Sequence, residues 1–407
     1  MTIKQLYPTQ RPALDLNFAR QKRLDPRVTF TRGSIATYVG SDGLIKTVAD
    51  HEPRFDHDPE TGESLGLLIE EARTNSVSLS IPQGTTPWSP RANTLYTLNA
   101  ATAPDGTLTA TKVSANVGNT GYAWARYTLG TAITGSSVVS VYAKDAGEGG
   151  CTVEANNTSG QSIYWFDFTT KTFGNRTGSG DGSDPRYQEL PNGWFRLSFS
   201  VGPGCNHITL NARYGWSGVM PTGDGVKGVL FWGAQLEAGT FPTSYIPTSG
   251  LTIQRGADVT SMTGTNFSSW YNQSEGSWFV NYEATFGKED TTVFTFNASN
   301  NNRIFSYTAN NRVQFKYGGP TVNSNRATTT NDYAKAVMFY ESDGTFGGSF
   351  EGTAVVSAAG TPNTATELNL APFPGAGGAL QSSTSHISRI AYYPVRLPDA
   401  TLQALTL

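Results

Sequence analysis

The chain has 407 residues, with 29 Lys and Arg against 32 Asp and Glu and a formal net charge of −3, so it lacks the basic excess typical of a nucleic-acid-binding protein. Charged residues make up 15% of the chain, 12% are aromatic and 44 are glycine, a composition that excludes a disordered chain and favours all-β structure rich in turns. No apolar run reaches the ~18 residues of a membrane span and the start of the chain has no apolar signal segment, so we expect neither membrane insertion nor export by a standard signal.

The first 75 residues hold much of the charge and few apolar side chains. One hairpin is predicted within them, because Asp42 and Gly43 separate two runs of β-forming residues. A segment so poor in core residues needs another surface in order to fold. We therefore predict an extended attachment segment over residues 1–75 that contacts neighbouring chains or another protein. The candidate assembly residues lie at its end: Leu67, Leu68, Ile69, Glu70 and Arg73.

Residues 76–250 carry apolar side chains at alternate positions, which is the period of a half-buried strand. In one such run Phe195 and Leu197 share a face, and Arg196 lies on the other. Turns rich in Gly and Asp separate the runs at spacings typical of a sandwich. The sequence thus predicts an antiparallel β-sandwich over 76–250 that ends in a linker at 247–250.

Residues 251–407 repeat the alternation, with Trp278 and Val280 on one face of an expected strand. The Asp-Gly pair at 343–344 predicts a hairpin. Pro398 is placed to begin a short helix. We predict a second antiparallel β-sandwich over this region.

Two cysteines, Cys151 and Cys205, fall in strand-like stretches of the central region, so a disulfide between them is conceivable. A sandwich of this size does not need a covalent link. We predict two buried free thiols and keep the disulfide as the alternative.

Catalytic and metal-binding patterns are weak. Glycoside hydrolysis usually needs two carboxylates about 5 to 9.5 Å apart, and those of "FDHDPETGE" lie in a turn-rich, solvated stretch. Glu70 and Glu71 are consecutive, so on a strand they would point to opposite faces. The four histidines have no neighbouring nucleophile motif. We predict no catalytic residue, no cofactor and no metal, with calcium at "DHDPE" or "DGSD" as the alternative.

Sugar binding needs flat aromatic faces beside side chains that form hydrogen bonds. The segments "GYAWARY" and "QSIYWFDF" supply such side chains. The candidate glycan-binding residues are Tyr122, Trp124, Arg126, Tyr164 and Trp165. The alternative is that these aromatics belong to the core, as we expect for Trp194, Trp232 and Trp278.

Long stretches of the chain resemble one family. "LDLNFARQKRLDPRVTFTRGSIATYVGSDGLI" and "PRFDHDPETGESLGLLIEEARTN" are similar to the N-terminal segment of many virion proteins of tailed bacteriophages, of the head-fibre, tail-fibre or LamG-like kind. "NGWFRLSFS", "WGAQLEAGTFPTSYIPTSG" and "RGADVTSMTGTNFSSWYNQSEGSWFVNYEATF" resemble their middle and C-terminal modules. The resemblance implies a carbohydrate-binding-like jelly roll over 76–250 and a LamG or concanavalin A-like sandwich over 251–407.

The resemblance also implies a function. We expect a non-enzymatic fibre or spike on the exterior of the virion, made in the host cytoplasm, that forms homotrimers. It would join other virion proteins through residues 1–75 and present lectin-like modules to host-surface glycans. Two alternatives stay open. One is a capsid decoration protein that braces the shell, and the other is a tailspike glycan depolymerase, although the long repetitive β-helix tract usual in such enzymes is not seen.

Overall fold

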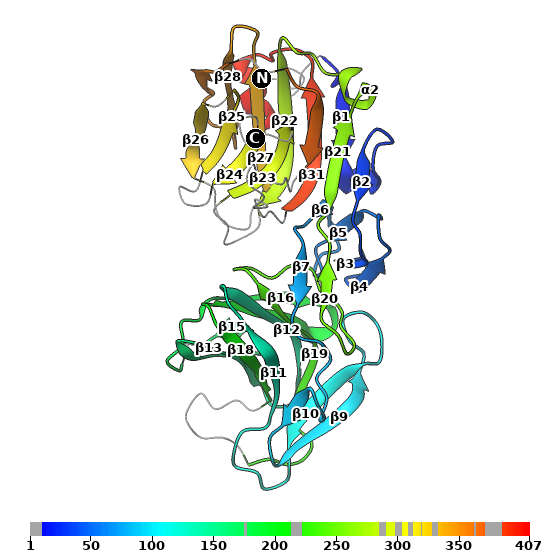
Figure 1. Ribbon diagram of the computed structural model, residues 1–407, viewed down its shortest axis with the longest axis vertical. Coiled ribbons are helices and arrows are strands. Elements are labelled where there is room, and N and C mark those ends of the chain that lie inside the picture. The colour runs from blue at the N-terminus through cyan, green and yellow to red at the C-terminus, as the bar shows by residue number, and fades with distance from the viewer. Residues whose placement is uncertain are drawn as a thin grey trace.

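The computed structural model describes residues 10–174, 177–212, 222–284, 290–297, 303–307, 312–318, 320–327, 333–361, 364–370 and 385–407. Antiparallel strands make up most of these ranges, so the all-β fold class is confirmed. The strands form two sandwiches that lie end to end (Figure 1). We name them the central sandwich, built from strands within residues 88–238, and the terminal sandwich, built from strands within residues 14–69 and 259–393.

The central sandwich packs two six-stranded sheets face to face. The first sheet has the order β16 (Ser183–Leu190), β17 (Trp194–Val201), β12 (Ser137–Ala146), β19 (Gly228–Ala238), β10 (Ala110–Ala115) and β9 (Thr94–Ala101). The second has the order β15 (Thr172–Phe173), β14 (Gly160–Asp167), β13 (Gly150–Asn157), β18 (Cys205–Asn211), β11 (Trp124–Ile133) and β8 (Trp88–Pro90). Phe195 and Leu197 are buried in the core, which confirms the faces assigned from their alternation.

The terminal sandwich pairs an eight-stranded with a seven-stranded sheet. The first has the order β29 (Val356–Ala359), β28 (Thr345–Phe350), β27 (Tyr333–Tyr340), β22 (Gly276–Ala284), β31 (Ser385–Tyr393), β6 (Ser64–Ile69) and β5 (Arg54–His57), with β1 (Leu14–Asn17) also on β31. The second has the order β2 (Thr29–Thr31), β21 (Val259–Thr263), β30 (Glu367–Leu370), β23 (Asp290–Phe296), β24 (Arg303–Tyr307), β25 (Arg312–Lys316) and β26 (Thr321–Ala327). β27 and β28 form the hairpin predicted at 343–344.

The helices are short: α1 (Phe18–Gln21), α2 (Thr265–Ser268), α3 (Asp399–Leu405) and a 3₁₀ turn at Pro191–Gly193. α3 follows Pro398 and confirms the short helix expected there. In the described ranges, none of these helices is long and apolar enough to cross a membrane.

Four strands within residues 14–69 are part of the terminal sandwich, which corrects the prediction of a separate attachment segment over residues 1–75. β1, β2, β5 and β6 are strands of its two sheets, and Leu67 in β6 lies opposite Ile387 in β31. The apolar residues of this segment are buried with those of the last third of the chain: Leu14, Leu16, Phe18, Leu67 and Ile69. The segment has too few apolar residues to form a core of its own, because it completes a core to which the last third of the same chain also contributes.

Two short sheets join the sandwiches (Figure 1). β3 (Ala36–Val39) and β4 (Ile45–Val48) form the hairpin predicted at Asp42 and Gly43, and Ile45 packs on the central sandwich beside Trp194 and Trp232. β7 (Arg73–Asn75) pairs with β20 (Ile253–Arg255), so the chain enters and leaves the central sandwich through one strand pair.

Cys151 and Cys205 are free and buried, as predicted. They begin the neighbouring antiparallel strands β13 and β18, so they lie at opposite ends of the sheet. Burial raises the pKa of the Cys205 thiol to about 11. Burial also raises the pKa of the Cys151 thiol, so both thiols are protonated at neutral pH.

Candidate functional site

One sheet of the central sandwich turns a polar and aromatic face away from the core. We name it the tryptophan face and define it by alternate residues of the neighbouring strands β11, β18, β13 and β14. These residues are Trp124, Arg126, Thr128, His207, Thr209, Asn211, Thr152, Glu154, Asn156, Gln161, Ile163 and Trp165. The residues between them in the sequence, such as Ala125, Val153 and Phe166, point into the core.

The strand register places two tryptophans at the ends of one row. Trp124 lies opposite Asn211, Asn211 opposite Thr152, and Thr152 opposite Trp165. Since neighbouring strands lie about 4.8 Å apart, three such spacings separate the two tryptophan backbones by about 14 Å. Between the two rings Thr152 is partly exposed, whereas Asn211 is 5% exposed. Two partly exposed rings with a hydroxyl between them suit a ligand longer than a single sugar ring.

Contacts within the protein hold both rings in place. The Arg126 guanidinium lies over the ring of Trp124, 4.6 Å from its centroid, and Arg126 Nε donates to Thr209 Oγ1 at 3.0 Å. Gly174 lies against the ring of Trp165 so closely that a Cβ at that position would be 1.5 Å from a ring carbon. Side chains that are already ordered lose less conformational entropy when a ligand binds.

A single carboxylate lies at the centre of this face. Glu154 accepts a hydrogen bond from Gln161 Nε2 at 2.7 Å. Its Oε1 is 3.5 Å from both Arg126 Nη2 and His207 Nε2. Among the residues that define the tryptophan face Glu154 is the one acid, so the face has a positioned acceptor but not the carboxylate pair that glycoside hydrolysis uses.

The structure separates the five candidate glycan-binding residues. Trp124, Arg126 and Trp165 come together on the tryptophan face. Tyr164 does not belong to the site, because it is the core-facing neighbour of Trp165 and its hydroxyl donates to the Gly182 carbonyl at 2.8 Å inside the protein.

Tyr122 lies just before β11 and outside the rows. Its side chain is 48% exposed, and the Arg91 guanidinium is 5.8 Å from its ring centroid. The tryptophans expected in the core are buried there: Trp194, Trp232 and Trp278.

The sequence prediction missed Thr152, Glu154, Thr209 and Asn211. Alternation in "CTVEANN" and "HITLN" does place these side chains opposite buried ones. Alternation does not predict the order of the strands across the sheet, which is β14, β13, β18 and β11. That order places the four residues between the strands of the two tryptophans.

The five candidate assembly residues are not a surface for another chain, because their own chain covers them. Leu67 and Ile69 are fully buried in the terminal core, and Leu68 is 3% exposed. Arg73 is paired with Glu71, both buried, and Arg73 also lies over the ring of Phe241. This corrects the prediction of an inter-chain contact through these side chains.

Glu70 belongs to a buried set of charges between the two sandwiches, which we name the junction network: Arg32, Arg54, Glu70, Arg255 and Asp258. Glu70 Oε2 is 2.6 Å from Arg54 Nη1 and 2.7 Å from Arg255 Nη1. Asp258 pairs with Arg32 and Arg54. Burial alone would raise the pKa of Glu70, but the guanidinium groups of Arg255 and Arg54 hold it well below its ordinary value.

The acidic turns considered for calcium have partners within the protein. Asp58 Oδ1 accepts from the backbone of Thr61 at 2.7 Å, and Asp181 Oδ1 accepts from Asn157 Nδ2 at 2.6 Å. Across the described ranges, no group of three or more His, Cys, Asp or Glu side chains is placed to hold a metal ion.

Comparisons with known proteins show likeness in fold only. No protein-family model matches the chain, and no curated protein sequence matches it. The CBM40 of the Ruminococcus gnavus IT-sialidase, bound to α2,3 sialyllactose, is 12% identical with a TM-score of 0.30, covering 35% of this chain and 87% of that one. A Bacteroides ovatus protein whose proposed role is carbohydrate binding is 8% identical with a TM-score of 0.30, covering 70% of this chain and 78% of that one. Trypanosoma rangeli sialidase is 10% identical with a TM-score of 0.30, covering 73% and 60%. Likeness at this level carries no argument about function.

Proposed function

We propose that this chain is a non-enzymatic structural protein on the exterior of a tailed-bacteriophage particle and that it binds host-surface glycans through the tryptophan face. The observation that carries glycan binding is the row in which Trp124 and Trp165 flank Asn211 and Thr152. The place on a phage particle is supported by the resemblance of the sequence to tailed-phage virion proteins.

The chemistry of the tryptophan face matches that of a carbohydrate. A pyranose has a face of C–H groups that packs on an indole ring, and its hydroxyls need nearby donors and acceptors. Partly or fully exposed hydroxyl, guanidinium, carboxylate and amide groups lie on this face, on Thr152, Arg126, Glu154 and Gln161. With Glu154 as its one acid, the face supports binding without hydrolysis.

We also propose that the chain forms homotrimers and meets the particle through the terminal sandwich. The two sandwiches lie end to end, so contact at the far end of the terminal sandwich leaves the tryptophan face free (Figure 1). Residues 1–75 would take part through exposed side chains of the terminal sandwich, and not through β6, which is buried.

Titration of the full chain with neutral oligosaccharides from the host surface tests the binding site. We expect Trp124→Ala and Trp165→Ala each to weaken binding at least about tenfold, or about 1.4 kcal/mol, because each removes a stacking surface. Leu98→Ala is the control, since Leu98 is 50% exposed on the other sheet. Unchanged affinity in both tryptophan variants would rule out this face, and release of shorter sugars by the wild-type chain would show an enzyme.

A further inference from the structure

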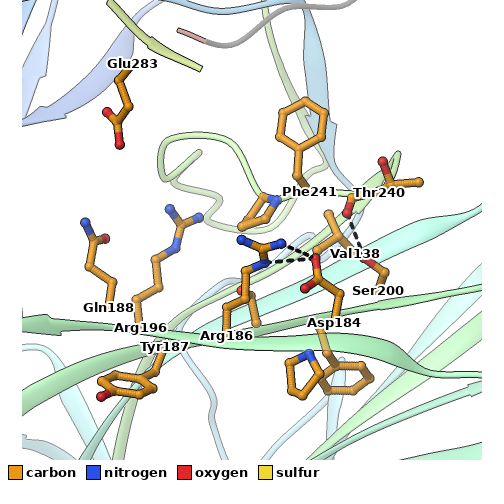
Figure 2. A pocket seen from close by; sticks show the side chains of 14 residues that line it. Val138, Asp184, Arg186, Tyr187, Gln188, Arg196, Ser200, Thr240, Phe241 and Glu283 are labelled. Atoms are coloured by element: carbon orange, nitrogen blue, oxygen red, sulfur yellow. Dashed lines mark hydrogen bonds and ion pairs between the residues drawn. The ribbon is translucent and has the colours of Figure 1, made fainter. Parts of the chain in front are cut away.

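A cleft runs between the two sandwiches on the side of the central sandwich opposite the tryptophan face. It consists of a cavity of about 550 Å³ and a neighbouring one of about 340 Å³. Both are lined by Gln188, Arg196, Pro242 and Glu283. Gln188 and Arg196 come from β16 and β17, whereas Glu283 comes from β22 of the terminal sandwich (Figure 2). The combined volume is within the range of small-ligand sites.

Arg196 brings a positive charge into this cleft that no described carboxylate neutralises. Its Nη2 donates to the Thr243 carbonyl at 2.6 Å and to Ser140 Oγ at 3.1 Å, and its guanidinium lies 5.5 Å from the ring centroid of Tyr142. Arg186 differs, since it is paired with Asp184 at 2.8 Å (Figure 2). Neutral contacts thus hold Arg196 in position while its charge stays available to an anion.

The opposite wall of the cleft has the reverse polarity. Glu283 extends toward the same space from the terminal sandwich (Figure 2), and its Oε2 is 2.6 Å from His386 Nδ1. His386 Nε2 is in turn 2.8 Å from Asp56 Oδ2. A ligand that fills the cleft therefore meets a guanidinium on one wall and a carboxylate acceptor on the other, with Gln188 and Ser198 beside the guanidinium.

We propose that the cleft is a second carbohydrate site and that it binds a sugar acid, such as a uronic or sialic acid unit. The sugar carboxylate would pair with Arg196, and its hydroxyl groups would donate to Glu283 and exchange hydrogen bonds with Gln188. A sugar acid carries an anion and several hydroxyl donors on one small ring, which is the combination that these two walls require. This site is distinct from the tryptophan face and extends the function proposed above to acidic glycans.

Titration of the full chain with free N-acetylneuraminic acid and glucuronic acid, monitored by ligand-observed NMR, tests the inference. The decisive variant is Gln188→Glu, because residues 188 and 196 are directly opposite on paired strands. A glutamate there has nearly the same shape and would pair with Arg196, so we expect at least a tenfold loss of affinity for the sugar acid with the fold retained. Arg196→Gln should give a similar loss. Arg27→Gln alters a partly exposed pair with Asp25, and neither residue lines either cavity, so this variant should leave affinity unchanged.

Glucose, N-acetylglucosamine and acetate complete the panel. Binding of the sugar acids that is insensitive to Gln188→Glu and Arg196→Gln would overturn the inference, as would acetate or a neutral sugar binding equally well. Neutral oligosaccharides report separately on the tryptophan face. A chain that binds those oligosaccharides but no sugar acid disproves the cleft site alone, and the converse result disproves the tryptophan face alone.

Discussion

Glu70 is 1% exposed and forms ion pairs with two guanidinium groups. We therefore expect its charge to contribute more to the stability of the fold than the charge of a surface acid. Breaking a buried ion pair on one side leaves the partner charge uncompensated and typically costs about 3–5 kcal/mol. We expect Glu70→Gln to lower the free energy of unfolding by about that amount in urea denaturation at pH 7. Asp25→Asn removes the partly exposed pair with Arg27 and should cost about 0–1 kcal/mol. Equal losses in the two variants would contradict the role given to the junction network.

The sign of the Glu70 pKa shift sets the pH range in which this stability is lost. Because the folded pKa lies below the unfolded value of about 4.3, the contribution of Glu70 is present above that pH. It is lost as the pH falls through the folded pKa. Wild-type stability should therefore fall more steeply in acid than that of Glu70→Gln.

His386 should contribute stability that is lost as the pH rises, which is the reverse of the pH dependence expected for Glu70. Burial alone would lower its pKa, but the hydrogen bonds to Asp56 and Glu283 raise it to about 10. The stabilisation is complete below the unfolded pKa of about 6.5 and is lost as the pH rises through about 10. We expect the difference in free energy of unfolding between wild type and His386→Gln to shrink between pH 6.5 and 10.5. A difference that is constant over this range would show that His386 is not charged in the folded protein.

At the scale of single residues, the sequence predicts which face a side chain occupies but not what covers that face. Alternation correctly predicted that Phe195 and Leu197 are buried. The sequence prediction placed both Tyr164 and Trp165 in the glycan site, but consecutive residues of a strand point to opposite faces, here of β14. Only the packing of the opposite sheet, whose Phe199 lies against Tyr164, decides that Tyr164 is the buried one.

Strand β6 shows how one element depends on distant sequence. Ile69→Ala should destabilise the chain by about 2–5 kcal/mol, because it leaves a cavity in the terminal core. Ile35→Ala is the matched control, since Ile35 is half exposed and should change stability by less than about 0.5 kcal/mol. Chemical denaturation of both variants checks the comparison, and a neutral Ile69→Ala would mean that β6 is not in the core.

At the scale of elements, local signals were sufficient for the hairpins at Asp42-Gly43 and Asp343-Gly344 and for α3. The pairing of β6 with β31 was not predictable in this way, since it joins residues 67 and 387. A segment with few apolar residues has the same composition whether its partner surface belongs to another protein or to a distant part of its own chain. Composition therefore indicated that residues 1–75 need a surface but not which one.

At the scale of the whole molecule, the two sandwiches differ in how the chain builds them. Residues 251–407 expressed alone lack β1, β2, β5 and β6, so we expect them to expose core surface, bind a hydrophobic dye and aggregate. Mixing with a separate fragment of residues 1–75 should restore a soluble complex that elutes as one species from a sizing column. A soluble, dye-free fragment 251–407 would show that the first strands are dispensable.

The route of the chain through the terminal sandwich has a consequence for its synthesis. Every strand of the central sandwich, β8 to β19, is synthesised before residue 250, so this part can close while translation continues. Strands β1 and β6 must wait for β31, which is almost the last element to be made. Until then the nascent chain exposes unpaired strand edges that can associate with other chains. Its yield should accordingly depend on how quickly translation reaches the final residues.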